Sequence, residues 1–294
     1  MILTKNKILN NLADKWWGRV LIFLILYLPV FKYFHSTFRE FFGQDIPRIF
    51  IDITLLIPPL IFSALLEGFR TNSKWHYFGL TIHKDLFRQV YQVLLITLSG
   101  FIVFGILFFI LGSKPHFDLD LSTPYYLLLI IYLLVSSLLE EIIFRGIIFQ
   151  ALTQRFGFIA SSVVLSFSFA AFHYSNPNIT FISFVNIFMA GIFFSLIYFQ
   201  TKSLITCWLS HFLWNFSSAF LIGSSVSGYD YGLNFIWFDF SSLPFYLSGG
   251  DFGIEGGLVT TIVLILDTFL IMKFVKPSPF IESMLLKRDY SPVS

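Results

Sequence analysis

The chain has 294 residues, of which 56% are hydrophobic and only 12% are charged, and its mean hydropathy is +0.78. A soluble domain is usually about one quarter charged, so this composition indicates a chain solvated by lipid. The net charge of +2 comes from scattered basic residues, which argues against nucleic-acid binding. Because Cys207 is the only cysteine, an intrachain disulfide and a cysteine-based zinc motif are excluded.

Eight apolar segments approach the length of about 20 residues that a helix needs to cross the hydrocarbon core of a bilayer. They are roughly 17–34, 48–66, 89–112, 125–150, 158–174, 179–200, 204–222 and 257–275. Residues 67–88 mix basic and aromatic side chains, as an interfacial helix does. Residues 223–256 carry Gly, Ser and Asp and no Lys or Arg, and we expect a long polar loop there. The sequence therefore predicts an all-α, polytopic membrane protein of about eight transmembrane helices, with residues 1–294 as one domain.

The distribution of basic residues fixes the predicted orientation. If the N-terminus lies inside, four of the 19 Lys and Arg residues fall in outside segments, namely Lys32, Arg39, Arg48 and Lys114, and Arg145 falls within a span. The other 14 fall in inside segments. This bias follows the positive-inside rule, so we expect a multi-pass protein of the cell membrane with both termini cytoplasmic.

The fourth span contains three charged side chains, in the sequence LLEEIIFRGIIF. An ionisable residue at the bilayer centre costs about 2.5–3.5 kcal/mol on insertion scales, so each needs a partner or a polar cavity. Glu141 and Arg145 stand four residues apart, the spacing at which a helical carboxylate meets a guanidinium. Glu140 points about 100° away from Glu141 and has no local partner. A buried ion pair that only joins helices is the structural alternative, but a carboxyl in an apolar setting is also a candidate general base.

Two later spans supply candidate partners for Glu140. His173 follows Phe169 by four residues near the end of the fifth span, and His211 and Asn215 lie four residues apart on one face of the seventh. A lone membrane histidine is more often a satisfied hydrogen-bonding group, and His211 with Asn215 is also compatible with interhelical hydrogen bonding. Together, a carboxylate, two imidazoles and an amide are what water activation and oxyanion stabilisation require.

Helix geometry tests whether these groups meet. In a hairpin that turns near Gly157, Glu140 lies 17 residues before the turn and His173 lies 16 after it. At ~1.5 Å per residue, both then lie about 25 Å from the turn. His211 is only about 10 Å past Leu204 on the same scale. The seventh helix must therefore begin inside the protein if His211 is to reach Glu140.

The ordered motifs Glu140-Glu141-x-x-x-Arg145, Phe169-x-x-x-His173 and His211-x-x-x-Asn215 resemble those of the CPBP (Abi/CAAX) intramembrane protease family, over about residues 120–222. That family includes the Ras-converting CAAX prenyl endopeptidase and bacterial proteins linked to bacteriocin self-immunity. The resemblance implies a membrane endopeptidase acting on a peptide or protein substrate in or at the membrane, of the prenylated, CAAX-like type.

The resemblance also implies roles for individual residues. Glu140 and His173 would activate water, His211 and Asn215 would stabilise the oxyanion, and Glu141 and Arg145 would organise the site. A metal-free mechanism is favoured, but a divalent metal such as zinc stays open, with Glu140, His173 and His211 as its ligands. Cys207 is expected to serve packing, and the mid-span Asp267 has no assigned role.

Two rival functions predict different behaviour. A non-catalytic immunity or scaffold protein of the Abi type would bind or shield a partner, and its phenotype would survive loss of Glu140. A transporter would use Glu140 as a proton site, and the lack of an evident internal repeat argues against it.

Overall fold

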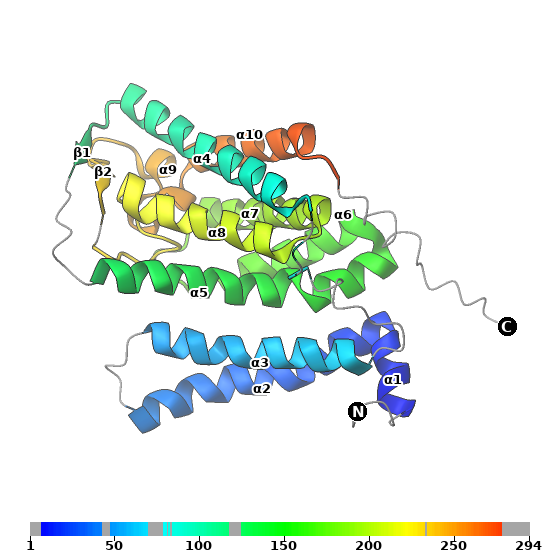
Figure 1. The fold of residues 1–294 in the computed structure, drawn as a ribbon. Helices are drawn as coiled ribbons and strands as arrows, with labels where there is room; N and C mark the ends of the chain where they lie inside the picture. Colours follow the sequence, from blue (N-terminus) through cyan, green and yellow to red (C-terminus); the bar gives the residue numbers. More distant parts are fainter. Residues whose placement is uncertain are drawn as a thin grey trace.

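The computed structural model describes residues 7–42, 48–69, 79–80, 82, 84–117, 125–232 and 234–277. Its helices are α1 (Lys7–Asp14), α2 (Trp16–Phe42), α3 (Arg48–Phe69), α4 (Leu86–Ile110), α5 (Tyr125–Arg145), α6 (Ile147–Phe172), α7 (Phe181–Thr201), α8 (Leu204–Ser217), α9 (Phe245–Ser248) and α10 (Leu258–Phe274). A π-helical turn, Ser218–Ile222, continues α8. The strands β1 (Pro115–Phe117) and β2 (Ile236–Phe238) pair antiparallel at one end of the bundle (Figure 1).

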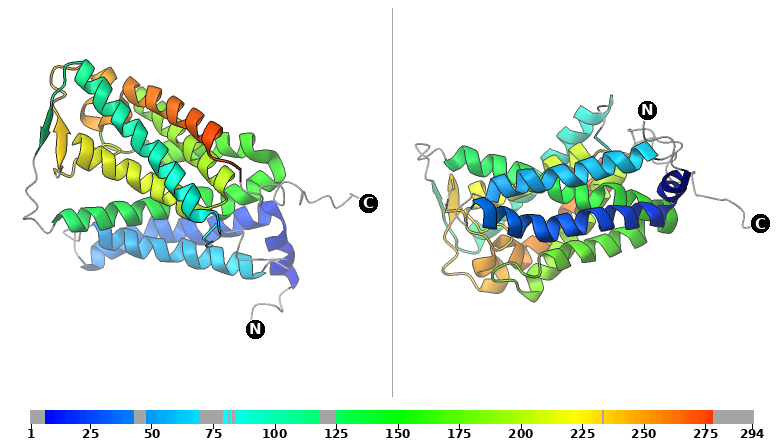
Figure 2. Two further views of the ribbon diagram at one scale, coloured as in Figure 1. Left: turned by 45° about the horizontal axis from the view of Figure 1, so that its top comes forward. Right: turned by 90° about the horizontal axis from the view of Figure 1, so that it is seen from below.

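The long helices run alternately up and down the bundle, and α2 and α3 form a hairpin that covers one side of it (Figures 1 and 2). This hairpin packs on α5 and α6, while α4, α7, α8 and α10 pack on one another in the larger part. The main hydrophobic core joins the two parts, since it includes Phe23 and Leu66 of the hairpin together with Phe193 and Trp214. Helix α5, which carries Glu140, thus lies between the α2–α3 hairpin and the larger part of the bundle.

The outer surface of the bundle is apolar along whole helices. On α10 the exposed large side chains recur every three or four residues, at Leu258, Ile262, Ile265, Phe269 and Met272. Soluble monomers rarely expose apolar patches beyond a few hundred Å², whereas a helix in lipid presents such a face. The predicted all-α class is therefore confirmed, and a polytopic membrane protein accounts for the exposed apolar surface.

Four stretches of the described residues are long and apolar enough to cross a membrane: Trp16–Tyr33, Leu86–Ile110, Tyr125–Phe172 and Phe181–Thr201. The third contains both α5 and α6. The count of eight crossings stays a prediction. The start of α2 and the end of α10 lie at the same end of the bundle (Figure 1), which is compatible with an even number of crossings. The cytoplasmic placement of both termini also stays a prediction.

Three of the predicted segments differ from the structure or lie partly outside the described residues. The expected span 125–150 is wrong at its end, because α5 ends at Arg145. The non-helical backbone of Gly146 then separates α5 from α6. The expected polar loop 223–256 is instead a folded segment with β2, α9 and short 3-10 turns, and its Phe252, Ile254 and Glu255 are buried. Half of the predicted interfacial helix, at 70–78, 81 and 83, lies outside the described residues.

Candidate active site

The predicted ion pair on α5 is confirmed. Arg145 Nη1 lies 3.1 Å from Glu141 Oε1, with the two side chains 1% and 0% exposed. The other guanidinium nitrogen, Nη2, donates to the carbonyl of Gly191 on α7 at 3.1 Å. The Arg145 guanidinium also lies over the ring of Phe169 at 4.7 Å. A buried charge needs such partners because the interior solvates it poorly, although Nε of Arg145 has no hydrogen-bond partner among the described residues.

Glu141 has two further partners that spacing along α5 did not reveal. His211 Nδ1 lies 2.7 Å from Glu141 Oε1, and the Cys207 thiol donates to Oε2 at 2.9 Å. Both partners come from α8. The carboxylate of Glu141 therefore binds Arg145 on its own helix and also fixes the rotation of α8.

Glu140 faces the other two motifs. Its Oε2 lies 3.8 Å from Nε2 of His173 and 3.8 Å from Nε2 of His211. The side chain is 20% exposed, and Oε2 is buried without a hydrogen-bond partner among the described residues. A separation of 3.8 Å is too long for a direct hydrogen bond but suits a contact through one water molecule. The structure thus joins Glu140 to both imidazoles, as the sequence predicted.

The other ring nitrogen of each histidine is held by an acceptor. His173 Nδ1 lies 2.8 Å from the carbonyl oxygen of Phe169. A carbonyl can only accept, so Nδ1 carries the hydrogen there. The same argument applies to His211 Nδ1 and the carboxylate of Glu141. In both rings the Nε2 atom is therefore the one left to face Glu140.

Glu140 and His173 lie at the same level along the bundle, as their equal distances from Gly157 predicted. The chain between them is interrupted at two places instead of forming a single hairpin turn. The helix is interrupted at Gly146, and within α6 Gly157 has φ 80° and ψ 172°. The positive φ of Gly157 favours glycine. The lengths of chain on either side of Gly157 are nearly equal, so the rise per residue brings Glu140 and His173 to one level.

The condition for His211 is also met, because α8 begins inside the bundle (Figure 1). Leu204, its first residue, is fully buried. The Leu204 backbone N–H donates to the carbonyl of Gly79 at 2.7 Å, and the Ser203 hydroxyl accepts from Thr206 N at 3.0 Å. These partners satisfy backbone groups that a helix start leaves free. The seventh predicted span is thus a short helix whose first residue is buried inside the bundle.

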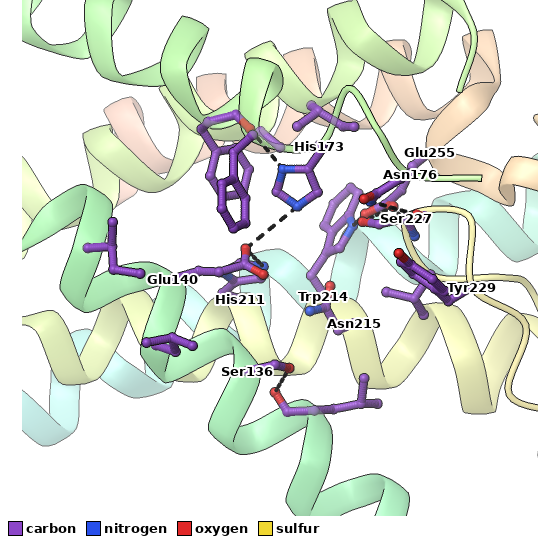
Figure 3. Close-up of a pocket in the computed structure, with 18 of the residues that line it drawn as sticks. Ser136, Glu140, His173, Asn176, His211, Trp214, Asn215, Ser227, Tyr229 and Glu255 are labelled. Carbon is purple, nitrogen blue, oxygen red and sulfur yellow. Dashed lines mark hydrogen bonds and ion pairs between the residues drawn. The ribbon is translucent and has the colours of Figure 1, made fainter. Parts of the chain in front are cut away.

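Asn215 lies one turn after His211 and donates through Nδ2 to the Ser137 hydroxyl at 3.2 Å. Both Asn215 and His211 line a cavity of about 660 Å³ that also contains Glu140 and His173 (Figure 3). All four residues predicted to act chemically therefore border one space. Glu141 and Arg145 lie behind its wall.

The family model described as type II CAAX prenyl endopeptidase Rce1-like matches residues 122–217. This segment is therefore similar to the Rce1-like family. The resemblance inferred from the motifs is thus confirmed. A comparison with curated proteins found no match.

The Rce1-like segment holds all six of the predicted site residues, which are Glu140, Glu141, Arg145, His173, His211 and Asn215. Other walls of the cavity come from outside the segment. Phe31 of α2 and Ile51 and Leu55 of α3 form an apolar side, and Glu255 lies next to Ser227 and Asn176 (Figure 3). The sequence analysis missed Glu255, because it stands alone in a stretch that reads as a loop.

The donor types of the Rce1-like site are those that zinc accepts. Among the residues that the structure describes, however, no group of three or more His, Cys, Asp or Glu side chains is arranged to hold a metal ion. The arrangement of Glu140, His173 and His211 thus does not fit a zinc site as it stands.

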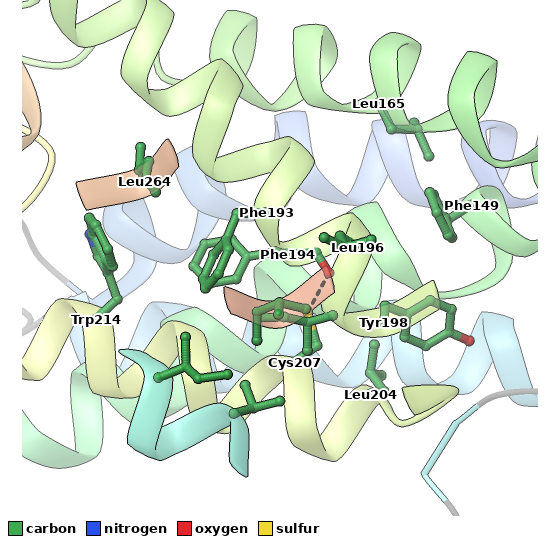
Figure 4. Close-up of a cluster of buried hydrophobic side chains, with 14 of the residues drawn as sticks. Phe149, Leu165, Phe193, Phe194, Leu196, Tyr198, Leu204, Cys207, Trp214 and Leu264 are labelled. Carbon is green, nitrogen blue, oxygen red and sulfur yellow. Dashed lines mark hydrogen bonds between the residues drawn. The ribbon is translucent and has the colours of Figure 1, made fainter. Parts of the chain in front are cut away.

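Two other residues singled out by the sequence lie apart from the cavity. Cys207 is fully buried in the hydrophobic core, where its thiol also lies 3.2 Å from the carbonyl of Phe194 (Figure 4). Asp267 on α10 is fully buried as well, and neither of its carboxyl oxygens has a hydrogen-bond partner among the described residues. A Cβ added to Gly100 of α4 would lie 2.4 Å from Asp267 Oδ2, so α4 and α10 approach closely there.

Proposed function

We propose that the protein is a membrane endopeptidase that hydrolyses a peptide bond of a membrane-associated, CAAX-like substrate. The observation that carries the proposal is the position of Glu140, whose carboxylate faces two imidazoles in a cavity inside an apolar helix bundle. The match of residues 122–217 to the Rce1-like family model supports the same activity.

In the first step, Glu140 acts as general base. A water molecule in reach of Glu140 and His173 gives one proton to the Glu140 carboxylate, and its oxygen bonds to the carbon of the scissile carbonyl. The 3.8 Å separation from Glu140 Oε2 to His173 Nε2 is compatible with one water molecule between them. Proton transfer to a positioned general base typically increases a reaction rate about 10²–10⁴-fold.

The negative charge that forms on the carbonyl oxygen needs donors. Asn215 Nδ2 supplies one, and its 3.2 Å bond to Ser137 is long enough to be exchanged for a stronger, charge-assisted one. His211 supplies another through Nε2–H when its ring is protonated. The Glu141 carboxylate, at 2.7 Å from Nδ1, stabilises that imidazolium and fixes its orientation.

In the last step, the tetrahedral intermediate collapses. The oxyanion reforms a carbonyl, the bond between carbon and nitrogen breaks, and the leaving amine takes the proton held by Glu140. The products are a carboxylic acid and an amine, so water is consumed and Glu140 returns to its starting state. Arg145 keeps Glu141 in place throughout, since it lies 3.1 Å from that carboxylate.

The lining of the cavity suggests how an amphipathic substrate would lie. The peptide bond belongs at Glu140, and an apolar group such as a prenyl chain fits along Phe31, Ile51 and Leu55. Leu55→Trp should fill this side. We expect a higher KM for a farnesylated peptide and an unchanged KM for the same peptide without the lipid, and equal effects on both peptides would argue against this placement.

The decisive experiment compares the purified protein with its Glu140→Gln variant in proteoliposomes. Both are given farnesylated and unmodified peptides, and new termini are identified by mass spectrometry. Glu140→Gln keeps the shape of the side chain but removes the base, so cleavage should fall about 10²–10⁴-fold. Glu40→Gln, the same change at an exposed position of α2, is the matched control and should cleave like the parent. Equal cleavage by Glu140→Gln would leave the non-catalytic immunity or scaffold function as the better account.

A further inference from the structure

One hydrogen-bonded network connects the two histidine-bearing segments on the side of the cavity away from Glu140. Its members are Asn176, Trp214, Ser227 and Glu255, which we call the Glu255 brace (Figure 3). Asn176 stands three residues after His173, and Trp214 stands three residues after His211. Each histidine thus has a member of the brace one helical turn or one tight turn away.

The carboxylate of Glu255 is the centre of the brace. Trp214 Nε1 donates to Oε1 at 3.0 Å, while the backbone N–H and the hydroxyl of Ser227 donate to Oε2 at 2.7 and 2.9 Å. Asn176 Nδ2 donates to the carbonyl of Ser227 at 2.9 Å. A continuous path therefore runs from Asn176 through Ser227 and Glu255 to Trp214, without passing through Glu140 or Glu141.

The surroundings of the brace hold it rigid. Asn186 Nδ2 donates to the backbone carbonyls of Glu255 and Gly257, at 2.8 and 2.9 Å. Ser227 has a φ of 49°, which costs energy for a residue with a Cβ and persists only where the surroundings fix it. The two hydrogen bonds to Glu255 and the one from Asn176 provide that fixation.

The Glu255 carboxylate cannot be replaced by an amide without losing at least one of its hydrogen bonds. All three groups that meet Glu255 are donors, and a carboxylate is acceptor-only. An amide would turn its NH₂ toward either Trp214 or Ser227, so at least one donor would lose its partner. Glu255 is 8% exposed and is therefore largely removed from water, which makes an unpaired donor there costly.

We propose that Glu255 is a positioning residue that sets the distance of both catalytic imidazoles from Glu140. This inference rests on the proposed function. Glu141 orients His211 from one side, whereas the brace ties the His211 and His173 segments together from the other. Because it acts on geometry and not on substrate affinity, loss of the brace should lower kcat and leave KM unchanged.

The test uses one variant for each branch of the brace. Glu255→Gln disturbs the centre, and Asn176→Asp replaces the donor to the Ser227 carbonyl with an oxygen of the same size. Thr260→Val is the matched control, because Thr260 donates to the carbonyl of Ile254 beside Glu255 but is not a member of the brace. That carbonyl keeps a second donor, Gly257 N.

We expect Glu255→Gln to lower kcat about 10- to 100-fold with KM unchanged, because small misplacements of catalytic groups have effects of this size. Asn176→Asp should lower kcat in the same direction, and Thr260→Val should not. A rise in KM alone would mean that Glu255 contacts the substrate, and parental kcat in both variants would mean that the brace has no positioning role. Either result overturns the proposal.

A second readout does not depend on cleavage and so separates failure of the brace from failure of the proposed function. The rate of carbethoxylation by diethyl pyrocarbonate is measured by mass spectrometry for His173 and His211. Both are nearly buried in the parent, and Glu255→Gln should increase both rates while Thr260→Val should not. Unchanged rates overturn the brace even if the parent protein proves inactive. Asn176→Asp supplies the same measurement if Glu255→Gln fails to fold.

Discussion

Replacing Glu141 by glutamine tests how the charges behind the cavity are balanced. The parent carboxylate accepts from Arg145, His211 and Cys207, all within 3.1 Å. Glutamine keeps the shape but has no charge, and its NH₂ would face donors. Arg145, at 1% exposure, would then be a buried cation without a negatively charged partner at this position, since the amide oxygen of the glutamine and the Gly191 carbonyl are both uncharged.

The expected cost follows from that loss. Breaking a buried ion pair by removing one partner typically destabilises a protein by about 3–5 kcal/mol, because the other charge is left uncompensated. Removing both charges avoids this penalty. Glu141→Gln with Arg145→Met should therefore be less destabilised than Glu141→Gln alone, by about 1–3 kcal/mol.

The free energy of unfolding can be measured by SDS titration of the protein in mixed micelles, with helicity and tryptophan fluorescence as two probes. Arg88, which forms a half-exposed pair with Asp85 at 3.1 Å, supplies the control. Asp85→Asn should change stability by less than about 1 kcal/mol, because exposed ion pairs contribute little. A cost at Glu141 as small as at Asp85, or strict additivity with Arg145→Met, would refute the reasoning.

Three further outcomes are expected. Gly191→Ala places a Cβ 2.8 Å from Ser166 Cα, so α6 and α7 must separate and stability should fall by about 1–3 kcal/mol in the same titration. Asp267→Asn should leave the thermal midpoint at neutral pH unchanged or raised, since its buried carboxyl has no partner to lose among the described residues. Treatment with a strong zinc chelator should leave peptide hydrolysis intact while Glu140→Gln still lowers it about 10²–10⁴-fold, and activity restored only by added zinc would contradict this.

Part of the site could be predicted because helix geometry is regular. Spacing on α5 separated Glu140 from the pair formed by Glu141 and Arg145, and the rise per residue placed Glu140 level with His173. The same arithmetic showed that α8 must begin inside the protein for His211 to arrive. These inferences needed only the sequence and the dimensions of a helix.

Other parts of the site depend on contacts between segments far apart in the sequence. The bond from His211 Nδ1 to Glu141 joins residues 70 positions apart, and no local pattern marks it. Glu255 stands among Gly and Ser in a stretch without helical periodicity, so its burial follows from how that stretch folds back onto α8. A polar composition indicates a connecting segment but does not tell whether the bundle buries it.

The buried start of α8 contacts Gly79, which lies outside the family-matching segment. The position of His211 along the bundle therefore depends on Gly79. A side chain at Gly79, whose φ is 78°, would bring its Cβ within 2.9 Å of Leu204 N and 3.0 Å of the Tyr198 ring. A helix displaced at its first residue moves as a rod, and His211 would move with it. The candidate site therefore depends on a contact outside residues 122–217. A protein engineer who transplants only that segment into another membrane scaffold would carry over all six candidate site residues and lose the contact between Gly79 and Leu204 that holds the start of α8.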